Sequence, residues 1–184
     1  MRLEDLRFIL NQLERMNSDP AGPFLNKLDV RQIALAGHSL GGLTALLGIQ
    51  EDTRFRAGIL LDPYLADDVS MPTATPVLVL AAGRTEWSEN EIHLWNNLEG
   101  PRLAVNYPGA EHSAPSDAVW LAKGAVETGE MSEEETVASI RDFIAAFLDA
   151  NLRGKPADSI LLGSSPKSRG VRVTTQTQML GNLP

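Results

Sequence analysis

The sequence has 184 residues, of which 43% are hydrophobic and 22% charged, a composition typical of a folded globular protein. The net charge of −8 disfavours a nucleic-acid partner, because its phosphates would be repelled. Cysteine is absent, which excludes disulfides, thiolate metal sites and a cysteine nucleophile. The three histidines, His38, His93 and His112, lack the i, i+4 spacing of a zinc-binding helix, so we expect no metal.

Three elements are predicted in the first fifty residues. Leucines spaced three or four residues apart indicate an amphipathic helix over residues 2–16. The short apolar run over residues 31–36 is typical of a buried parallel strand. Residues 43–49 are apolar nearly all round, as in a helix that is covered on both sides. No run of the sequence is long and apolar enough to span a membrane.

Between this strand and this helix lies Gly-His-Ser-Leu-Gly-Gly, residues 37–42. A sharp turn from strand to helix strains the backbone of its central residue, Ser39, and we expect Gly37 and Gly41 to remove side chains that would collide. The Ser39 hydroxyl would then stand above the sheet as a nucleophile. The backbone N–H of Leu40, at the helix N-terminus, would stabilise an oxyanion beside it.

The same residues have an alternative interpretation. Gly37 and Gly42, followed by Leu43 and Thr44, have the spacing of a phosphate-binding loop. Leu43 stands where that loop needs a lysine to contact the phosphates, and no nearby basic residue replaces it. Nucleotide binding is therefore disfavoured.

Further along the chain, strands alternate with helices. Three apolar runs predict buried strands at residues 57–61, 76–82 and 102–107, and apolar residues near 94–98 indicate a helix. Ser132 and Glu135 form a capping box that opens an amphipathic helix ending near residue 151. This alternation predicts an α/β fold with a mainly parallel sheet, helices on both faces and a site at the carboxyl ends of the strands.

The composition changes after residue 152. We expect one domain over residues 1–152 and a C-terminal extension over residues 153–184, disordered in part. The extension carries five basic residues and one acid, whereas the rest of the chain is strongly acidic. A solvated tail is the simpler interpretation, and docking of the basic tail on the acidic body is the alternative.

A nucleophilic serine needs a histidine to take its proton and a carboxylate to orient that histidine. His112 follows the last predicted strand, while His38 adjoins the serine and is expected to point elsewhere, and His93 lies in a helix. Two acids are candidates: Asp62 ends the second strand, and Glu86 follows the third. The position after the third strand is common for the acid in hydrolases of this type, so topology alone favours Glu86.

The residues from Gly37 to Gly42, together with those from Glu51 to Asp62, resemble the platelet-activating-factor acetylhydrolase family of α/β-hydrolases, which also includes dienelactone-hydrolase-like relatives. The resemblance covers roughly residues 29–124. It implies a triad of Ser39, Asp62 and His112, no cofactor, and hydrolysis of carboxylic esters, either short-acyl or lipid-like, through an acyl-enzyme.

Two departures from the family bear on these expectations. Tyr64 stands where animal members usually have tryptophan, which leaves the natural ester open. The family also has several strands before the serine strand, and here one helix precedes it, so we expect a truncated sequence. The alternative function is then a non-catalytic or incomplete fragment that needs those strands or a partner chain. An exposed sheet edge would favour self-association, and localisation stays open.

Overall fold

The computed structural model describes residues 2–65, 71–84, 86–165, 167 and 169–175. Its helices and strands are, in chain order, α1 (Arg2–Ser18), β1 (Ile33–His38), α2 (Leu40–Glu51), β2 (Phe55–Leu61), β3 (Val77–Ala82), α3 (Glu89–Asn97), β4 (Arg102–Tyr107), α4 (Ala118–Leu121), α5 (Glu133–Leu152), the 3₁₀ helix η1 (Ser159–Leu162) and β5 (Arg172–Thr175).

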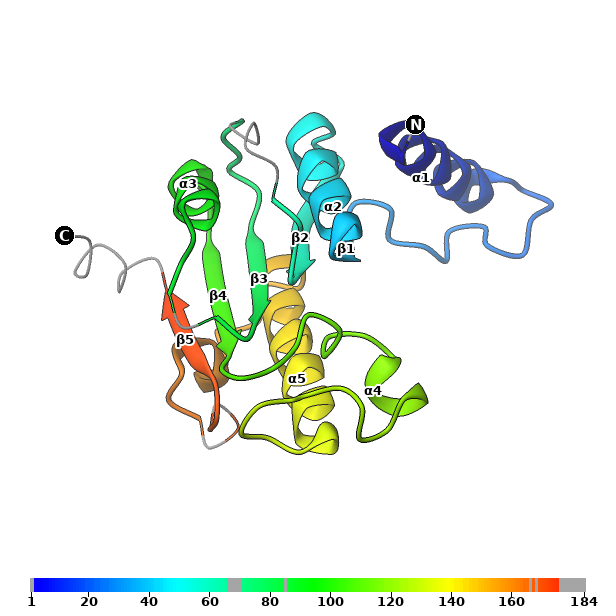
Figure 1. Cartoon of the computed structure of the whole chain (residues 1–184). Helices are drawn as coiled ribbons and strands as arrows, with labels where there is room; N and C mark the ends of the chain where they lie inside the picture. Colours follow the sequence, from blue (N-terminus) through cyan, green and yellow to red (C-terminus); the bar gives the residue numbers. More distant parts are fainter. Residues whose placement is uncertain (1, 66–70, 85, 166, 168, 176–184) are drawn as a thin grey trace.

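The strands form one sheet with the order β1-β2-β3-β4-β5 (Figure 1). β1 to β4 are parallel to one another, and β5 runs antiparallel to β4. The prediction of an α/β fold with a mainly parallel sheet is confirmed. The carboxyl ends of the parallel strands lie at one end of the sheet, so the loops that follow β1, β2 and β4 meet there.

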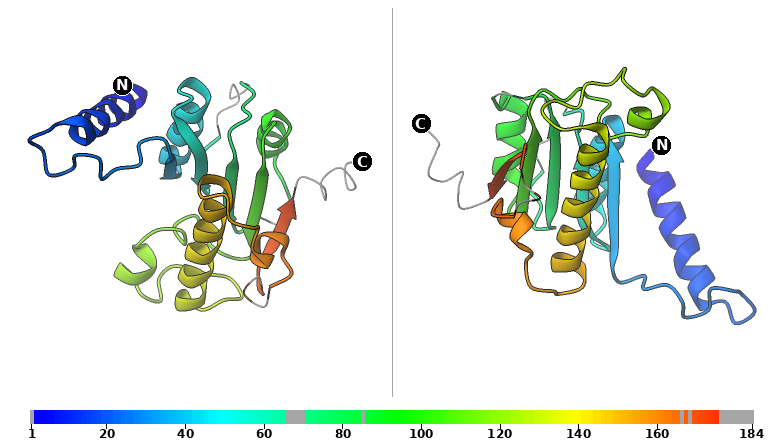
Figure 2. Two further views of the ribbon diagram at one scale, coloured as in Figure 1. Left: turned by 180° about the vertical axis from the view of Figure 1, so that it is seen from behind. Right: turned by 90° about the horizontal axis from the view of Figure 1, so that it is seen from below.

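Helices cover both faces of the sheet, as expected (Figure 2). α5 packs Phe143 and Phe147 on one face, over Ile59 and Leu80. On the other face, α1, α2 and α3 contribute the side chains Leu10, Leu46, Ile49, Leu94 and Trp95. These two apolar layers enclose β2, β3 and β4; β3 is buried throughout, and most residues of β2 and β4 are buried.

α1 lies beyond the β1 edge of the sheet, where Figure 1 shows it beside α2. Arg54, at the start of β2, links this helix to the sheet. Its guanidinium donates to Asn11 Oδ1 at 2.8 Å and to Glu14 Oε2 at 3.0 Å on α1, and also to Asp52 Oδ2 at 2.6 Å. The bond from Arg54 holds the pKa of the Asp52 carboxyl below its usual value.

We expect Arg54→Met to lower the free energy of unfolding by about 1–2 kcal/mol, because hydrogen bonds between charged groups that are partly exposed are lost. The folded-state pKa of Asp52 is depressed, so its stabilising effect is present above the unfolded value of about 3.9 and is lost as the pH falls below it. Urea unfolding at pH 7 and at pH 3 checks this. An unchanged difference between variant and wild type at pH 3 would contradict it.

The start of α3 was missed by the sequence analysis, and η1 and β5 were missed entirely. Ser88 and Glu91 form a capping box, so α3 begins at Glu89, five residues before the apolar residues that indicated it. Beyond residue 152, where an extension is predicted, η1 buries Ile160 and Leu161 against the core, and β5 pairs with β4. Lys167 also contacts Asp142 of α5 at 3.0 Å, and docking of the basic segment on the acidic body stays a prediction. Residues 176–184 lie outside the described part of the chain.

Candidate active site

Ser39 occupies the turn between β1 and α2. Its backbone has φ 56° and ψ −120°, a conformation that costs a non-glycine residue about 1–3 kcal/mol. Four backbone bonds hold it there: Ser39 N–H donates to Leu61 O at 3.0 Å, and Ser39 O accepts from Gly42 N at 2.9 Å, from Leu43 N at 3.3 Å and from Tyr64 N at 3.0 Å. The strained turn is thus fixed by both its own helix and the loop after β2.

The glycines around Ser39 have different reasons to be there. A Cβ at Gly37 would overlap the backbone carbonyl of Gly41, and one at Gly42 would stand 2.9 Å from Pro63 Cβ. A Cβ at Gly41 would meet nothing within 4 Å. The expected collision therefore exists at Gly37, while at Gly41 it does not, and Gly42 is the second position where the turn needs a glycine.

Asp62 directly follows β2 and is 3% exposed. Its positive φ of 40° turns the chain away from the sheet. One carboxylate oxygen, Oδ2, lies 2.5 Å from Nδ1 of His112, and the other, Oδ1, accepts from the backbone N–H of Ala82 at 3.0 Å. The carboxylate is therefore buried, paired with the histidine and anchored to the end of β3.

His112 lies in the loop after β4. Backbone bonds from Ala110 N to Tyr107 O (3.1 Å) and from Glu111 N to Glu127 O (2.8 Å) fix the residues before it. The imidazole and Ser39 line one hollow of about 270 Å³, together with Pro63, Tyr64, Leu65, Arg84, Ser88, Asn90 and Glu91. The loops after β1, β2 and β4 thus bring serine, aspartate and histidine to the same end of the sheet.

From the sequence we expect His38 to point away from the site. In the structure its ring lies against His112. Its Nε2 lies 2.7 Å from the backbone carbonyl oxygen of His112, and the two rings are 4.6 Å apart, centre to centre. The side chain before the serine therefore links the serine turn to the histidine loop. No spacing rule in the sequence indicated this, because residues 38 and 112 meet only through the strand order.

The remaining predicted residues are placed as follows. Glu86 is exposed in the loop between β3 and α3, and the carboxylate that contacts His112 is that of Asp62. Leu40 is the first residue of α2, so its N–H lies at the helix N-terminus. His93 lies in α3 beside Asn97. Among the described residues, no group of three acidic or histidine side chains is arranged to hold a metal, and no helix could span a membrane.

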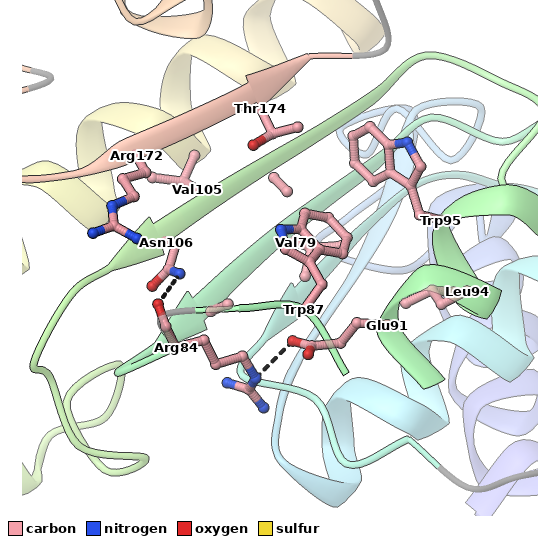
Figure 3. Close-up of a pocket in the computed structure, with 12 residues that line it drawn as sticks. Val79, Arg84, Trp87, Glu91, Leu94, Trp95, Val105, Asn106, Arg172 and Thr174 are labelled. Atoms are coloured by element: carbon pink, nitrogen blue, oxygen red, sulfur yellow. Dashed lines mark hydrogen bonds and ion pairs between the residues drawn. The ribbon is translucent and has the colours of Figure 1, made fainter. Parts of the chain in front are cut away.

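A second cavity, of about 90 Å³, lies between α3 and strands β3 to β5 (Figure 3). Trp87, Trp95, Val79 and Val105 line it. Ser39 and His112 are not among its lining residues, but Arg84 and Glu91 are, and these two also line the hollow that holds Ser39. The Arg84–Glu91 pair therefore stands between the two spaces.

A mainly parallel sheet covered on both faces, with a strained serine turn after one strand, defines the fold of an α/β-hydrolase. Comparison with known proteins gives the family. Residues 17–153 match the family described as platelet-activating factor acetylhydrolase, isoform II, and the chain belongs to this family. The resemblance seen in the sequence is thus confirmed.

Sequence identity between this chain and individual relatives is low. Platelet-activating factor acetylhydrolase of Gallus gallus is 23% identical over 156 residues, which is 77% of this chain and 37% of that protein. The Cavia porcellus protein of the same name is 34% identical over 79 residues, 41% of this chain and 16% of that protein. This chain therefore spans well under half of these relatives. A solved ferulic acid esterase from Streptomyces cinnamoneus superposes with a TM-score of 0.77 and 28% identity, over 95% of this chain and 54% of that one.

Proposed function

We propose that this chain hydrolyses carboxylic esters, with Ser39 as the nucleophile and an acyl-enzyme as the intermediate. The observation that carries the proposal is the contact of 2.5 Å between His112 Nδ1 and Asp62 Oδ2, in a hollow that His112 shares with the strained Ser39. The comparisons support ester hydrolysis over a non-catalytic role, because the relatives are named acetylhydrolase and esterase.

Each residue then has a defined task. His112 takes the proton of the Ser39 hydroxyl as its oxygen attacks the ester carbonyl, and then gives that proton to the departing alcohol. Asp62 orients His112 and stabilises its charged form. The Leu40 N–H donates to the oxyanion of the tetrahedral intermediate. Water, activated by His112, then attacks the acyl group and releases the acid together with free Ser39. No cofactor takes part in these steps.

The hollow favours a short acyl group. Its volume of about 270 Å³ is at the small end of ligand sites, and the exposed ring of Tyr64 lies at its wall beside Pro63. We infer that the acyl group lies beside Ser39 and is small, and that the alcohol part of the ester extends past Tyr64. The proposal includes esters of lipid-like alcohols and esters of aromatic alcohols.

A fluorophosphonate probe tests the nucleophile. We expect one covalent adduct, located on Ser39 by mass spectrometry of the digested protein, together with loss of p-nitrophenyl acetate hydrolysis. Ser39→Ala should abolish labelling, whereas Ser113→Ala, in the loop that carries His112, should label as the wild type does. An adduct on another residue, or labelling that survives in Ser39→Ala, would overturn the proposal.

A further inference from the structure

Arg84 contacts the acid of the candidate triad from the side opposite the histidine. It lies in the loop after β3, and its Nη1 donates to Asp62 Oδ1, the oxygen that does not contact His112. The same Nη1 donates to the carbonyl oxygen of Ala82 at 3.1 Å. Arg84 therefore bridges the end of β3 and the carboxylate that follows β2.

The guanidinium is itself held in place. Its Nε lies 2.6 Å from Oε1 of Glu91, a residue that is 9% exposed, and Figure 3 shows this pair along one wall of the cavity. The other oxygen of Glu91 accepts from Ser88 N at 2.8 Å and from Ser88 Oγ at 2.7 Å, in the capping box of α3. Arg84 is thus tied to the first turn of a helix through a buried acid.

These contacts form a row: His112, Asp62, Arg84, Glu91 and the start of α3. With Oδ1 held by Arg84 and by the Ala82 N–H, the Asp62 carboxylate cannot rotate, so Oδ2 stays aimed at His112 Nδ1. Because Glu91 neutralises Arg84, the row retains the net negative charge that stabilises an imidazolium. A fixed plane and a retained charge are what the orienting acid requires.

We propose that Arg84, held by Glu91, is a positioning residue for Asp62 in the candidate triad. The inference rests on the proposed function, and it assigns a role to two residues that the triad itself does not include. The sequence showed neither, because the pairing depends on the loop after β3 folding back over Asp62.

Variants at Arg84 and Glu91 test the proposal through p-nitrophenyl acetate hydrolysis over a range of pH. Arg84→Met leaves Oδ1 with the Ala82 N–H as its remaining donor, so the carboxylate can shift, and kcat should fall by about 10²-fold, the scale of a misplacement of about 1 Å. It also leaves two carboxylates unneutralised near His112, which favours the imidazolium, so the acidic limb of kcat/KM should move up by about one pH unit. Glu91→Gln leaves the guanidinium uncompensated, so the limb should move down.

Two further variants separate charge from geometry. Arg84→Met combined with Glu91→Gln removes both charges, so its limb should lie between those of the single variants. Arg84→Lys keeps the charge without the fork, so we expect it to restore the limb but only part of kcat. Asp62 and His38, which contact His112, are unchanged throughout, and so is Tyr64, which lines the same hollow; Arg84 and Glu91 are the charged groups of that hollow that the variants alter. Arg54→Met, an ion-paired arginine at the far end of β2, should leave the limb in place.

The outcomes are distinct. If Arg84→Met labels and turns over at the wild-type rate with an unmoved limb, the positioning role is overturned. Limbs that move in the same direction in Arg84→Met and Glu91→Gln would also overturn it. Should Arg84→Met fail to fold by thermal melting, Arg84→Lys and Glu91→Gln decide the question. If the wild type itself shows no fluorophosphonate adduct on Ser39, the failure belongs to the proposed function instead.

Discussion

Asp62→Asn is expected to lower the turnover of p-nitrophenyl acetate by about 10⁴-fold, whereas Glu86→Gln should change it less than about threefold. The neutral amide of asparagine cannot stabilise the positive charge of the imidazolium. Its oxygen or its NH₂ group can pair with either tautomer of His112, so the required tautomer is no longer fixed. Asp62 is buried and contacts His112 Nδ1 at 2.5 Å, while Glu86 is exposed in its loop.

Steady-state kinetics on the two variants checks this, with thermal melting to show that both are folded. Labelling of Ser39 by the fluorophosphonate should slow in Asp62→Asn and remain on the same residue. A far larger loss in Glu86→Gln than in Asp62→Asn would contradict the assignment and return the acid to the loop after β3.

Gly37→Ala is expected to be the most damaging change of one methyl group. Its Cβ would overlap the backbone carbonyl of Gly41, which cannot swing away as a side chain would, so we expect a loss of about 3 kcal/mol in the free energy of unfolding. Any relief of this overlap must move Ser39, which lies between the two glycines, and a shift of about 1 Å would lower turnover about 10²-fold.

Gly41→Ala is the matched control for this prediction. Its Cβ has open space, and alanine is favoured over glycine inside a helix by about 1 kcal/mol, so the melting temperature should stay equal or rise. Urea unfolding of both variants compares them directly. If both glycines proved equally sensitive, the overlap at Gly37 would not be what demands glycine there.

The elements that could be predicted are those with strong local patterns. Apolar runs gave the four parallel strands within one or two residues, and Ser132 with Glu135 marked the start of α5. The serine turn was visible for the same reason, because strand, glycines and helix are adjacent in the chain.

The acid of the candidate triad was not fixed by topology, which favoured Glu86. The resemblance to a family pointed to Asp62, whose contact with His112 the structure then provides.

What could not be predicted depends on contacts between distant residues. β5 has one large apolar residue, Val173, and forms a strand because the open edge of β4 supplies its hydrogen-bond partners. His38 meets His112, and Arg84 meets Asp62, only once the strands are in order. Polar side chains in loops carry no periodic pattern, so the sequence held no signal for these contacts.

The order of the strands has a consequence for how the chain folds during synthesis. Each of β2, β3 and β4 pairs with the strand made immediately before it, so this part of the sheet can grow in one direction as residues leave the ribosome. β5 is an exception, because it pairs with β4 although α5 and η1 lie between them in the chain. Until it arrives, one edge of β4 has unpaired backbone groups, so the nascent chain is exposed to strand-to-strand aggregation at that edge.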